Sequence, residues 1–245
     1  MNLINRRFRR NRFSDEFEEI RRIARGSFGT VYEVRNKKDN GVYAIKKVPL
    51  NDKNNKVITR ELDLMSKLIS DSIVVYKDFW IENNYYLRDN YDDFTQPENS
   101  VHHKSNIYLL HIQMELCLMT LREIIIYLNK NEINDEPKDY YYIKCEIFKE
   151  ILESIGYLHK ESVIHRDIRP ENILLTEGKN GRFVKICDFG IAIVHESTLK
   201  SHTEDRGNLK YMAPEVEHGG MYDMRADIYS LGVIIKELYK KEFEK

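Results

Sequence analysis

The residues best suited to chemistry lie in one short stretch, "VIHRDIRPENILL", at positions 163–175. Asp167 stands between Arg166 and Arg169, and Asn172 follows Asp167 by five positions. Valine, isoleucine and leucine flank these polar residues on both sides. Apolar runs of this kind are typical of buried segments, and charged side chains are rarely enclosed unless they are paired. The pattern therefore predicts a site in which charges are held between two buried segments.

Glycines mark a second candidate site, "RGSFGTV" at positions 25–31. Gly26 and Gly29 join two expected strands, and a backbone without side chains lets N–H groups approach phosphate oxygens closely. An ordinary hairpin could use the same residues, so two interpretations stay open for this loop alone. A third stretch, "DFG" at 188–190, follows an expected strand and places Asp188 21 positions after Asp167 (188 − 167).

The elements that must position these residues change in kind along the chain. Strand-like segments are expected at 17–26, 29–37, 41–50 and 73–82, with another beginning at Asn106. The Asn40-Gly41 pair predicts a hairpin turn. A helix over 56–69 is expected from the spacing of Ile58, Leu62, Met65 and Ile69. Residues 84–105 are polar and contain Pro97, which predicts an inserted loop.

The second half of the chain is expected to be mostly helical. Thr120 and Glu123 have capping-box spacing at the start of one helix. A long amphipathic helix over 138–160 would bury Ile143, Ile147, Leu152, Ile155 and Leu158. The strand "RFVKICDFG" follows, and an apolar helix is expected near 225–242. The order predicts a strand-rich small lobe followed by a helical large lobe.

Composition limits the classes of protein that remain. The chain has 245 residues, 42% of them hydrophobic and 32% charged, which indicates a soluble globular protein. With 39 Lys+Arg against 40 Asp+Glu, the net charge of -1 gives no global reason to bind nucleic acid or an anionic membrane. No apolar run approaches the ~20 residues of a membrane span, and the start of the chain has no apolar signal-peptide core. Three separated cysteines indicate a reducing compartment and no zinc site.

A basic run opens the chain, "RRFRRNR" at 6–12. Two interpretations remain, a nucleic-acid or nuclear-import arm and a solvated tail, and the general weakness of short basic runs favours the tail. Nucleic acid is therefore not an expected partner, except weakly through this tail.

Taken in order, "RGSFGTV", "YAIKK", the helix with Glu61, "HRDIRPEN", "DFG" and "YMAPE" resemble the eukaryotic protein kinase family. The resemblance spans about residues 17–242 and implies an α+β, bilobal protein-kinase-like fold. A small antiparallel β lobe with one main helix (14–117, with the insert 84–105) would follow a basic tail (1–13). A mostly helical large lobe (118–245) would then lack its usual last helices. Val233, Ile234, Ile235, Leu238 and Tyr239 would not all be covered.

The resemblance also assigns roles around ATP and Mg²⁺. Asp167 would orient the substrate hydroxyl, and Arg169, where the family usually has lysine, would reach the γ-phosphate. Lys46 would hold the α- and β-phosphates and pair with Glu61, although each alone would be interpreted as an exposed residue. Asn172 and Asp188 would bind magnesium, since this hard cation prefers oxygen ligands.

The remaining expected contacts surround the nucleotide. Gly26, Ser27 and Gly29 would cover the phosphates, and Val31, Ala44 and Leu174 would sandwich the adenine ring. Met114 would lie behind the ring, and the backbone of Glu115 and Cys117 would hydrogen-bond to adenine. The apolar members would belong to a core in any fold. Asp227 would brace the catalytic loop, and His165 would have a structural role.

Two longer stretches, "IVVYKDFWIE" and "SNIYLLHIQMELCLMTLREII", are similar to kinases of the alpha subunit of translation initiation factor 2. This likeness implies a serine/threonine protein kinase with that subunit as candidate substrate. It also implies a homodimer through the small lobe and a cytoplasmic location, with the nucleus as the alternative. Arg166 indicates either pairing with a phosphorylated activation segment, at Ser197, Thr198, Ser201 or Thr203, or pairing with a nearby carboxylate.

Departures from the family pattern keep other functions open. Ala24 replaces a glycine, Asn208 replaces a threonine, and Arg169 replaces a lysine. With the expected short large lobe, they leave a pseudokinase, a nucleotide-binding scaffold without phosphotransfer, as the main alternative. A small-molecule phosphotransferase is disfavoured by "YMAPE".

Overall fold

The computed structural model describes residues 8–26, 29–50, 55–83, 108–131, 138–179, 181–190, 192–194, 208–218 and 223–240. The chain forms two compact units, residues 1–55 with 76–116 and residues 56–75 with 117–245. The sequence alone placed 56–75 in the small lobe by their order along the chain, whereas here they group with the second unit.

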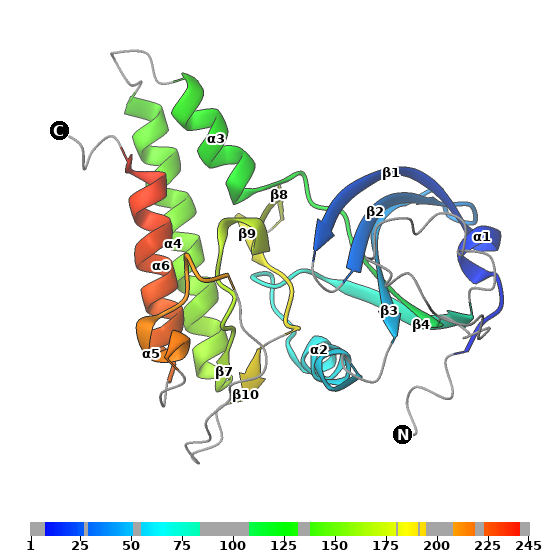
Figure 1. Ribbon diagram of the computed structural model, residues 1–245. Helices are drawn as coiled ribbons and strands as arrows, with labels where there is room; N and C mark the ends of the chain where they lie inside the picture. Colours follow the sequence, from blue (N-terminus) through cyan, green and yellow to red (C-terminus); the bar gives the residue numbers. More distant parts are fainter. Residues whose placement is uncertain are drawn as a thin grey trace, which may run out of the picture. The chain divides into compact units, whose positions relative to one another are not determined.

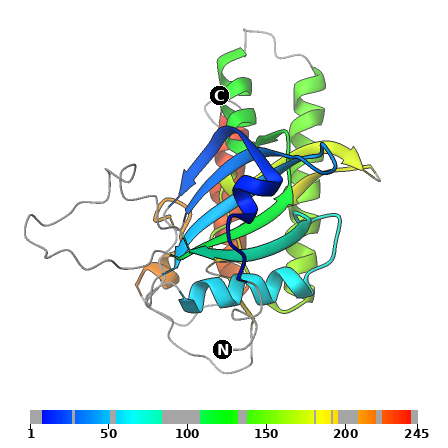
Figure 2. The ribbon, with the colours of Figure 1, turned by 90° about the vertical axis from the view of Figure 1, so that its right-hand side faces the viewer.

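The first unit is built on an antiparallel sheet with the strand order β1-β2-β3-β5-β4 (Figures 1 and 2). Its strands are β1 (Phe17–Gly26), β2 (Gly29–Asn36), β3 (Val42–Leu50), β4 (Tyr76–Asn83) and β5 (Tyr108–Glu115). Asn40 adopts a left-handed conformation (φ 58°) in the turn between β2 and β3. The hairpin expected from Asn40-Gly41 is therefore present.

Helix α1 (Arg12–Glu16) packs on this unit through an aromatic stack. The rings follow one another in the order Phe13, His111, Trp80 and Phe17, with centroids 5.4, 5.1 and 5.6 Å apart. The Arg12 guanidinium lies 4.3 Å from the Trp80 ring centre and pairs with Asp78 at 2.7 Å. The last part of the expected tail, residues 8–13, is thus joined to the folded unit, since Phe8 also bridges Ile81.

The second unit combines helices with short strands. The helices are α2 (Asn55–Lys67), α3 (Leu121–Asn131), α4 (Lys138–Lys160), α5 (Pro214–Glu217) and α6 (Arg225–Leu238). The strands are β6 (Met119–Thr120), β7 (Val163–Ile164), β8 (Ile173–Lys179), β9 (Arg182–Ile186) and β10 (Ile193–Val194). Helices α4 and α6 lie side by side (Figure 1), and their apolar residues share one core with β7, β8 and β9. A sheet-based unit and a helical unit confirm the expected α+β class.

The start of α3 shows the expected capping box. Thr120 N donates to Glu123 Oε2 at 2.7 Å, and Glu123 N donates to Thr120 Oγ1 at 3.2 Å. The bounds of α4 also agree with the expected 138–160.

Helices α2 and α4 each bury a face that only partly matches the apolar residues with helical spacing. In α2, Glu61 and Leu64 are buried. Just beyond the helix end, Leu68 is also buried, whereas Ile69 is 86% exposed. In α4, Ile147, Ile155 and Leu158 are buried as expected, but Ile143 and Leu152 are exposed. Leu152 is five residues from Ile147, about 140° around the helix at 100° per residue, so it cannot share that face.

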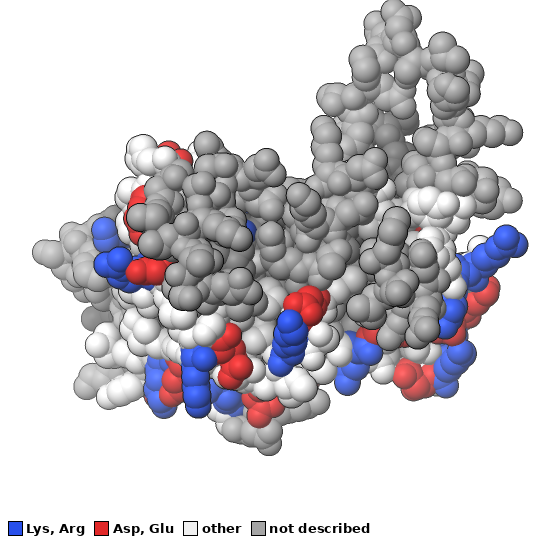
Figure 3. Space-filling view, turned by 90° about the horizontal axis from the view of Figure 1, so that it is seen from below, with Lys and Arg blue, Asp and Glu red and all other residues white. Residues whose placement is uncertain are grey.

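Helix α6 is covered on one side. Ile234 and Leu238 are fully buried, while Val233, Ile235 and Tyr239 are only partly buried, so the five residues are not all covered. Within the residues that the structure describes, no helix is both long and apolar enough to cross a membrane. On the face drawn in Figure 3, the described Lys and Arg side chains lie among Asp and Glu, as the balanced charge leads one to expect.

Candidate active site

A β-hairpin in the second unit brings two of the expected metal ligands to one place. Strands β8 and β9 pair antiparallel, with Ile173 opposite Ile186, so the start of β8 lies beside the end of β9. Asn172 immediately precedes β8, and Asp188 lies two residues after β9. The Cys187 N–H also donates to the Asn172 carbonyl at 3.0 Å. The hairpin therefore positions both side chains at its open end.

The loop that carries Asp167 is held by a single buried carboxylate. Asp227, at the start of α6, is fully buried and accepts from His165 N at 3.0 Å and from Arg166 N at 2.9 Å. His159 Nε2 also lies 2.9 Å from Asp227 Oδ2. Arg166 has φ 66°, a left-handed conformation that costs roughly 1–2 kcal/mol for a residue with a side chain. The two backbone hydrogen bonds to Asp227 hold this strained turn.

His165 links the same loop to the segment of Asp188. It is fully buried, its Nε2 lies 3.0 Å from the Cys187 carbonyl oxygen, and its ring meets the Phe189 ring edge-on at 5.1 Å. Asp188 is also left-handed (φ 64°). Two strained residues next to reactive side chains are typical of functional sites.

Asp167 lies within hydrogen-bonding distance of Asn172, five residues later. Asn172 Nδ2 donates to Asp167 Oδ2 at 2.7 Å and to the Asp167 carbonyl at 2.9 Å. The backbone N of Asn208 makes a long contact of 3.5 Å to Asp167 Oδ1. The Asn208 side-chain oxygen instead accepts from Lys210 N at 3.0 Å. Asn208 thus approaches the carboxylate through its backbone alone.

Arg169 is paired with a neighbour that the sequence did not single out. Its Nε lies 3.0 Å from Glu171 Oε2. Neither of these two buried atoms has a hydrogen-bond partner among the described residues, so the contact is an ion pair without hydrogen-bond alignment. Such a pair restrains the guanidinium less than an aligned, charge-assisted bond would.

In the first unit, the residues expected around the nucleotide share one face of the sheet. Ala44 is opposite Met114, and Lys46 is opposite Val31 and Ile112. Residues 44 and 46 point to the same side of β3, and directly opposed residues of an antiparallel pair share a face. Val31, Ala44, Lys46 and Met114 therefore form one surface. The aromatic stack lies on the other face, because Lys47 is opposite His111.

The two loop glycines differ in what the fold requires of them. A Cβ on Gly29 would clash with the Lys47 carbonyl, so β3 itself requires glycine there. A Cβ on Gly26 would meet only the Gly29 carbonyl oxygen, at an ordinary 3.9 Å. Among the described residues, packing therefore gives no steric reason why residue 26 must be glycine.

For the other expected site residues, the structure gives only the burial of the side chain, or does not describe the residue. Lys46 is 7% and Glu61 is 3% exposed, unlike the exposed residues that each would suggest in isolation, but they belong to different units. Glu115, Cys117 and Leu174 are half-buried. Ser27 and the candidate phosphorylation sites Ser197, Thr198, Ser201 and Thr203 lie outside the described residues, as does the insert 84–105.

The donor set suits magnesium bound together with phosphate. Among the described residues, no group of three or more His, Cys, Asp or Glu side chains could hold a metal by itself. Mg²⁺ usually takes one or two protein oxygen ligands and completes its shell with water and phosphate oxygens. Both amide hydrogen bonds from Asn172 to Asp167 come from Nδ2, which turns the side-chain oxygen away from that carboxylate. One amide oxygen and one carboxylate at the hairpin end fit this requirement.

Comparison with known proteins agrees with the motifs. The sequence pattern of the protein kinase domain matches residues 17–244. The interferon-induced, double-stranded RNA-activated protein kinase of Rattus norvegicus is 35% identical over 233 residues, covering 93% of this chain and 42% of the relative. The eIF-2-alpha kinase GCN2 of Arabidopsis thaliana is 31% identical, covering 94% of this chain and 20% of the relative.

A kinase with a different kind of name also matches. Calcium-dependent protein kinase 4 of Plasmodium falciparum is 32% identical, covering 91% of this chain and 37% of the relative. The chain thus spans less than half the length of these relatives. The match to the kinase domain and to kinases of initiation factor 2 confirms the resemblance found in the motifs, and the chain belongs to the protein kinase family.

Proposed function

We propose that the chain is an ATP- and Mg²⁺-dependent protein kinase that phosphorylates serine or threonine hydroxyls. The observation that carries this proposal is the loop around Asp167. Asp227 holds its strained backbone, and Asn172 binds the Asp167 carboxylate at 2.7 Å. A non-catalytic scaffold has no need for a carboxylate fixed in this way beside a pair of magnesium-type ligands.

The residues would divide the reaction as follows. The Asp167 carboxylate would accept a hydrogen bond from the acceptor hydroxyl and orient its oxygen toward the γ-phosphorus. Arg169, only loosely paired with Glu171, would exchange that ion pair for the transferring phosphate. Lys46 would hold the inner phosphates. Asn172 and Asp188 would hold magnesium, which neutralises developing phosphate charge when it is bound.

The substrate proposed first is the alpha subunit of translation initiation factor 2. Support comes from relatives whose names state this activity, including the Arabidopsis kinase. Serine/threonine specificity rests on "RPEN" and "YMAPE".

The test is transfer of labelled γ-phosphate by the full chain and by its Asp167→Ala variant. The alpha subunit and a generic basic protein serve as parallel acceptors. We expect label on serine or threonine with the unaltered chain only. Nucleotide binding with equal, background-level transfer by both proteins would instead indicate a nucleotide-binding scaffold.

A further inference from the structure

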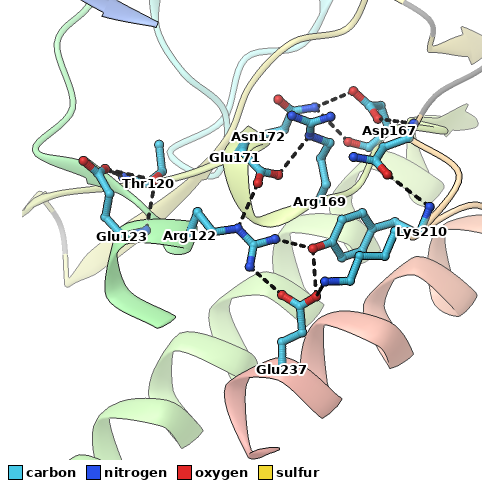
Figure 4. A network of polar contacts seen from close by, with 11 residues as sticks. Thr120, Arg122, Glu123, Asp167, Arg169, Glu171, Asn172, Lys210 and Glu237 are labelled. Carbon is cyan, nitrogen blue, oxygen red and sulfur yellow. Dashed lines mark hydrogen bonds and ion pairs between the residues drawn. The ribbon is translucent and has the colours of Figure 1, made fainter. Parts of the chain in front are cut away.

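One polar network joins four separate segments of the second unit around Arg122 (Figure 4). Arg122 belongs to α3, and its Nε donates to Glu171 Oε1 at 2.8 Å, while its Nη1 donates to Glu237 Oε2 at 2.6 Å. Its Nη2 donates to the Tyr211 hydroxyl. All of the directional contacts of the guanidinium thus lead to groups far away in sequence. Glu171 and Tyr211 lie within the motifs "HRDIRPEN" and "YMAPE", but the sequence did not indicate that they pair with Arg122.

The first arm of the network runs into the loop of Asp167. Glu171 divides its carboxylate between two arginines, with Oε1 toward Arg122 and Oε2 toward Arg169. The bond to Arg122 is aligned, and the contact to Arg169 is not. Arg122 therefore holds the Glu171 carboxylate in place, and this carboxylate then binds Arg169 less strongly.

The second arm runs into the segment 208–211. The Tyr211 hydroxyl donates to Glu237 Oε1 at 2.9 Å, and Lys210 pairs with the same oxygen. Asn208, in the same turn, accepts from Tyr211 N at 3.0 Å, and its own N–H points to Asp167. The turn that approaches Asp167 is therefore fixed to α6 through groups that Arg122 also contacts.

The charges in this network are complementary. Burial alone would raise the pKa of Glu237, but hydrogen bonds from Lys210, Arg122 and Tyr211 outweigh it and lower that pKa. Burial likewise opposes ionisation of Glu171, and the hydrogen bond from Arg122 contributes to a lowered pKa. Both carboxylates are thus charged at neutral pH, and removing Arg122 would leave two partly buried anions short of a cation.

We propose that Arg122 is a positioning residue for phosphoryl transfer. It holds Glu171 on one side and Tyr211 with Glu237 on the other. The loop of Asp167 and the turn 208–211 thereby keep their positions around the Asp167 carboxylate. The proposal rests on the proposed kinase function. Displacement of reacting groups by about 1 Å can cost on the order of 100-fold in rate. Loss of Arg122 should therefore act on the rate of transfer and leave ATP binding nearly intact, since none of its contacts involves a residue expected to bind the nucleotide base.

The chain offers a matched control in Arg182. Its side chain is 24% exposed against 25% for Arg122, and it too makes several contacts, to Glu153 at 2.6 Å and to the Glu150 carbonyl at 3.2 Å. These contacts join β9 to α4 and do not involve the segments around Asp167. Arg182→Gln thus removes a similar ion-pair cluster from the same unit without touching the network.

The experiment compares Arg122→Gln, Arg122→Lys and Arg182→Gln by steady-state kinetics and amide hydrogen exchange of the full chain. We expect Arg122→Gln to lower kcat about 10- to 100-fold, with KM for ATP changed less than about threefold and with faster exchange at 208–211. Lysine should restore part of kcat because it keeps the charge but lacks the forked head. Arg182→Gln should leave kcat and this exchange unchanged.

The proposal is overturned if Arg122→Gln keeps the original kcat, or if Arg182→Gln lowers kcat as much. Should Arg122→Gln fail to fold, Tyr211→Phe removes only one hydroxyl from the network and must still lower kcat, or the proposal is wrong. Failure of the kinase function itself is seen separately, because the unaltered chain would then transfer no more phosphate than Asp167→Ala.

Discussion

Replacing Asp227 by asparagine tests how the loop of Asp167 is held. The change keeps the size of the side chain but converts one acceptor oxygen into an NH₂ group. Two backbone N–H groups, of His165 and Arg166, now bond to this fully buried carboxylate. Only one of them can keep an acceptor in the variant, and the other would face a second donor.

The expected change in the free energy of unfolding follows from these contacts. A hydrogen bond to a charged group contributes about 1.5–3 kcal/mol, and a buried donor left without a partner costs about 1–3 kcal/mol. The two values overlap in part, so we expect Asp227→Asn to lower the free energy of unfolding by about 3 kcal/mol. Relaxation of the left-handed Arg166 would offset about 1 kcal/mol of this and would move Asp167. We therefore also expect kcat to fall on the order of 100-fold.

Circular dichroism during urea unfolding is the suitable assay, because most helical residues belong to the second unit. The single tryptophan, Trp80, belongs to the first unit, and its fluorescence follows that unit separately. Asp63→Asn is the control, since Asp63 is in an exposed i,i+4 pair with Lys67 that is worth roughly 0.3–0.5 kcal/mol. A loss of stability for Asp227→Asn no larger than that for Asp63→Asn would show that Asp227 does not hold the loop in this way.

Three further predictions concern the remaining parts of the site and the first unit. Gly26→Ala should raise KM for ATP several-fold. Its unfolding midpoint should stay within error, because a Cβ at position 26 meets no clash. An unchanged KM for ATP would mean that this loop does not approach phosphate. Arg169→Lys should keep or raise kcat, whereas Arg169→Ala should lower kcat more than it raises KM for ATP, and full activity of the alanine variant would exclude a role in transfer. Burial, followed by repulsion from Lys47, lowers the pKa of His111 to about 3. Between pH 6.5 and 3, therefore, His111 gains a proton only in the unfolded chain. The free energy of unfolding should then fall with falling pH, by up to ~1.4 kcal/mol per pH unit. His111→Phe should remove that slope in Trp80-monitored unfolding, and equal slopes in both proteins would contradict this origin.

Local sequence signals predicted the elements well because they act through the backbone. The capping box of Thr120 and Glu123 and the turn at Asn40 depend on neighbours within a few residues, and both are present. The helix α2 itself was predicted, but its buried face was not, because two stripes of residues have helical spacing there. Counting apolar residues favoured the stripe ending at Ile69, whereas the buried stripe includes the charged Glu61.

The candidate site was predicted in its motifs and in the supporting roles of Asp227 and His165, but not in the network around Arg122. Hairpin pairing explains why Asn172 and Asp188, far apart in sequence, lie at one end of β8 and β9. The contacts of Arg122 with Glu171 and Glu237 span 49 and 115 residues, and no local pattern reports such pairs. They depend on how α3 and α6 pack, which composition and periodicity do not specify.

The most direct test of the central claim is phosphate transfer from labelled ATP and Mg²⁺ by the full chain, with the acceptor residue identified after hydrolysis. We expect labelled phosphoserine or phosphothreonine on a protein acceptor, and background label with Asp167→Ala. Equal labelling by the two proteins, or label on tyrosine alone, would contradict it.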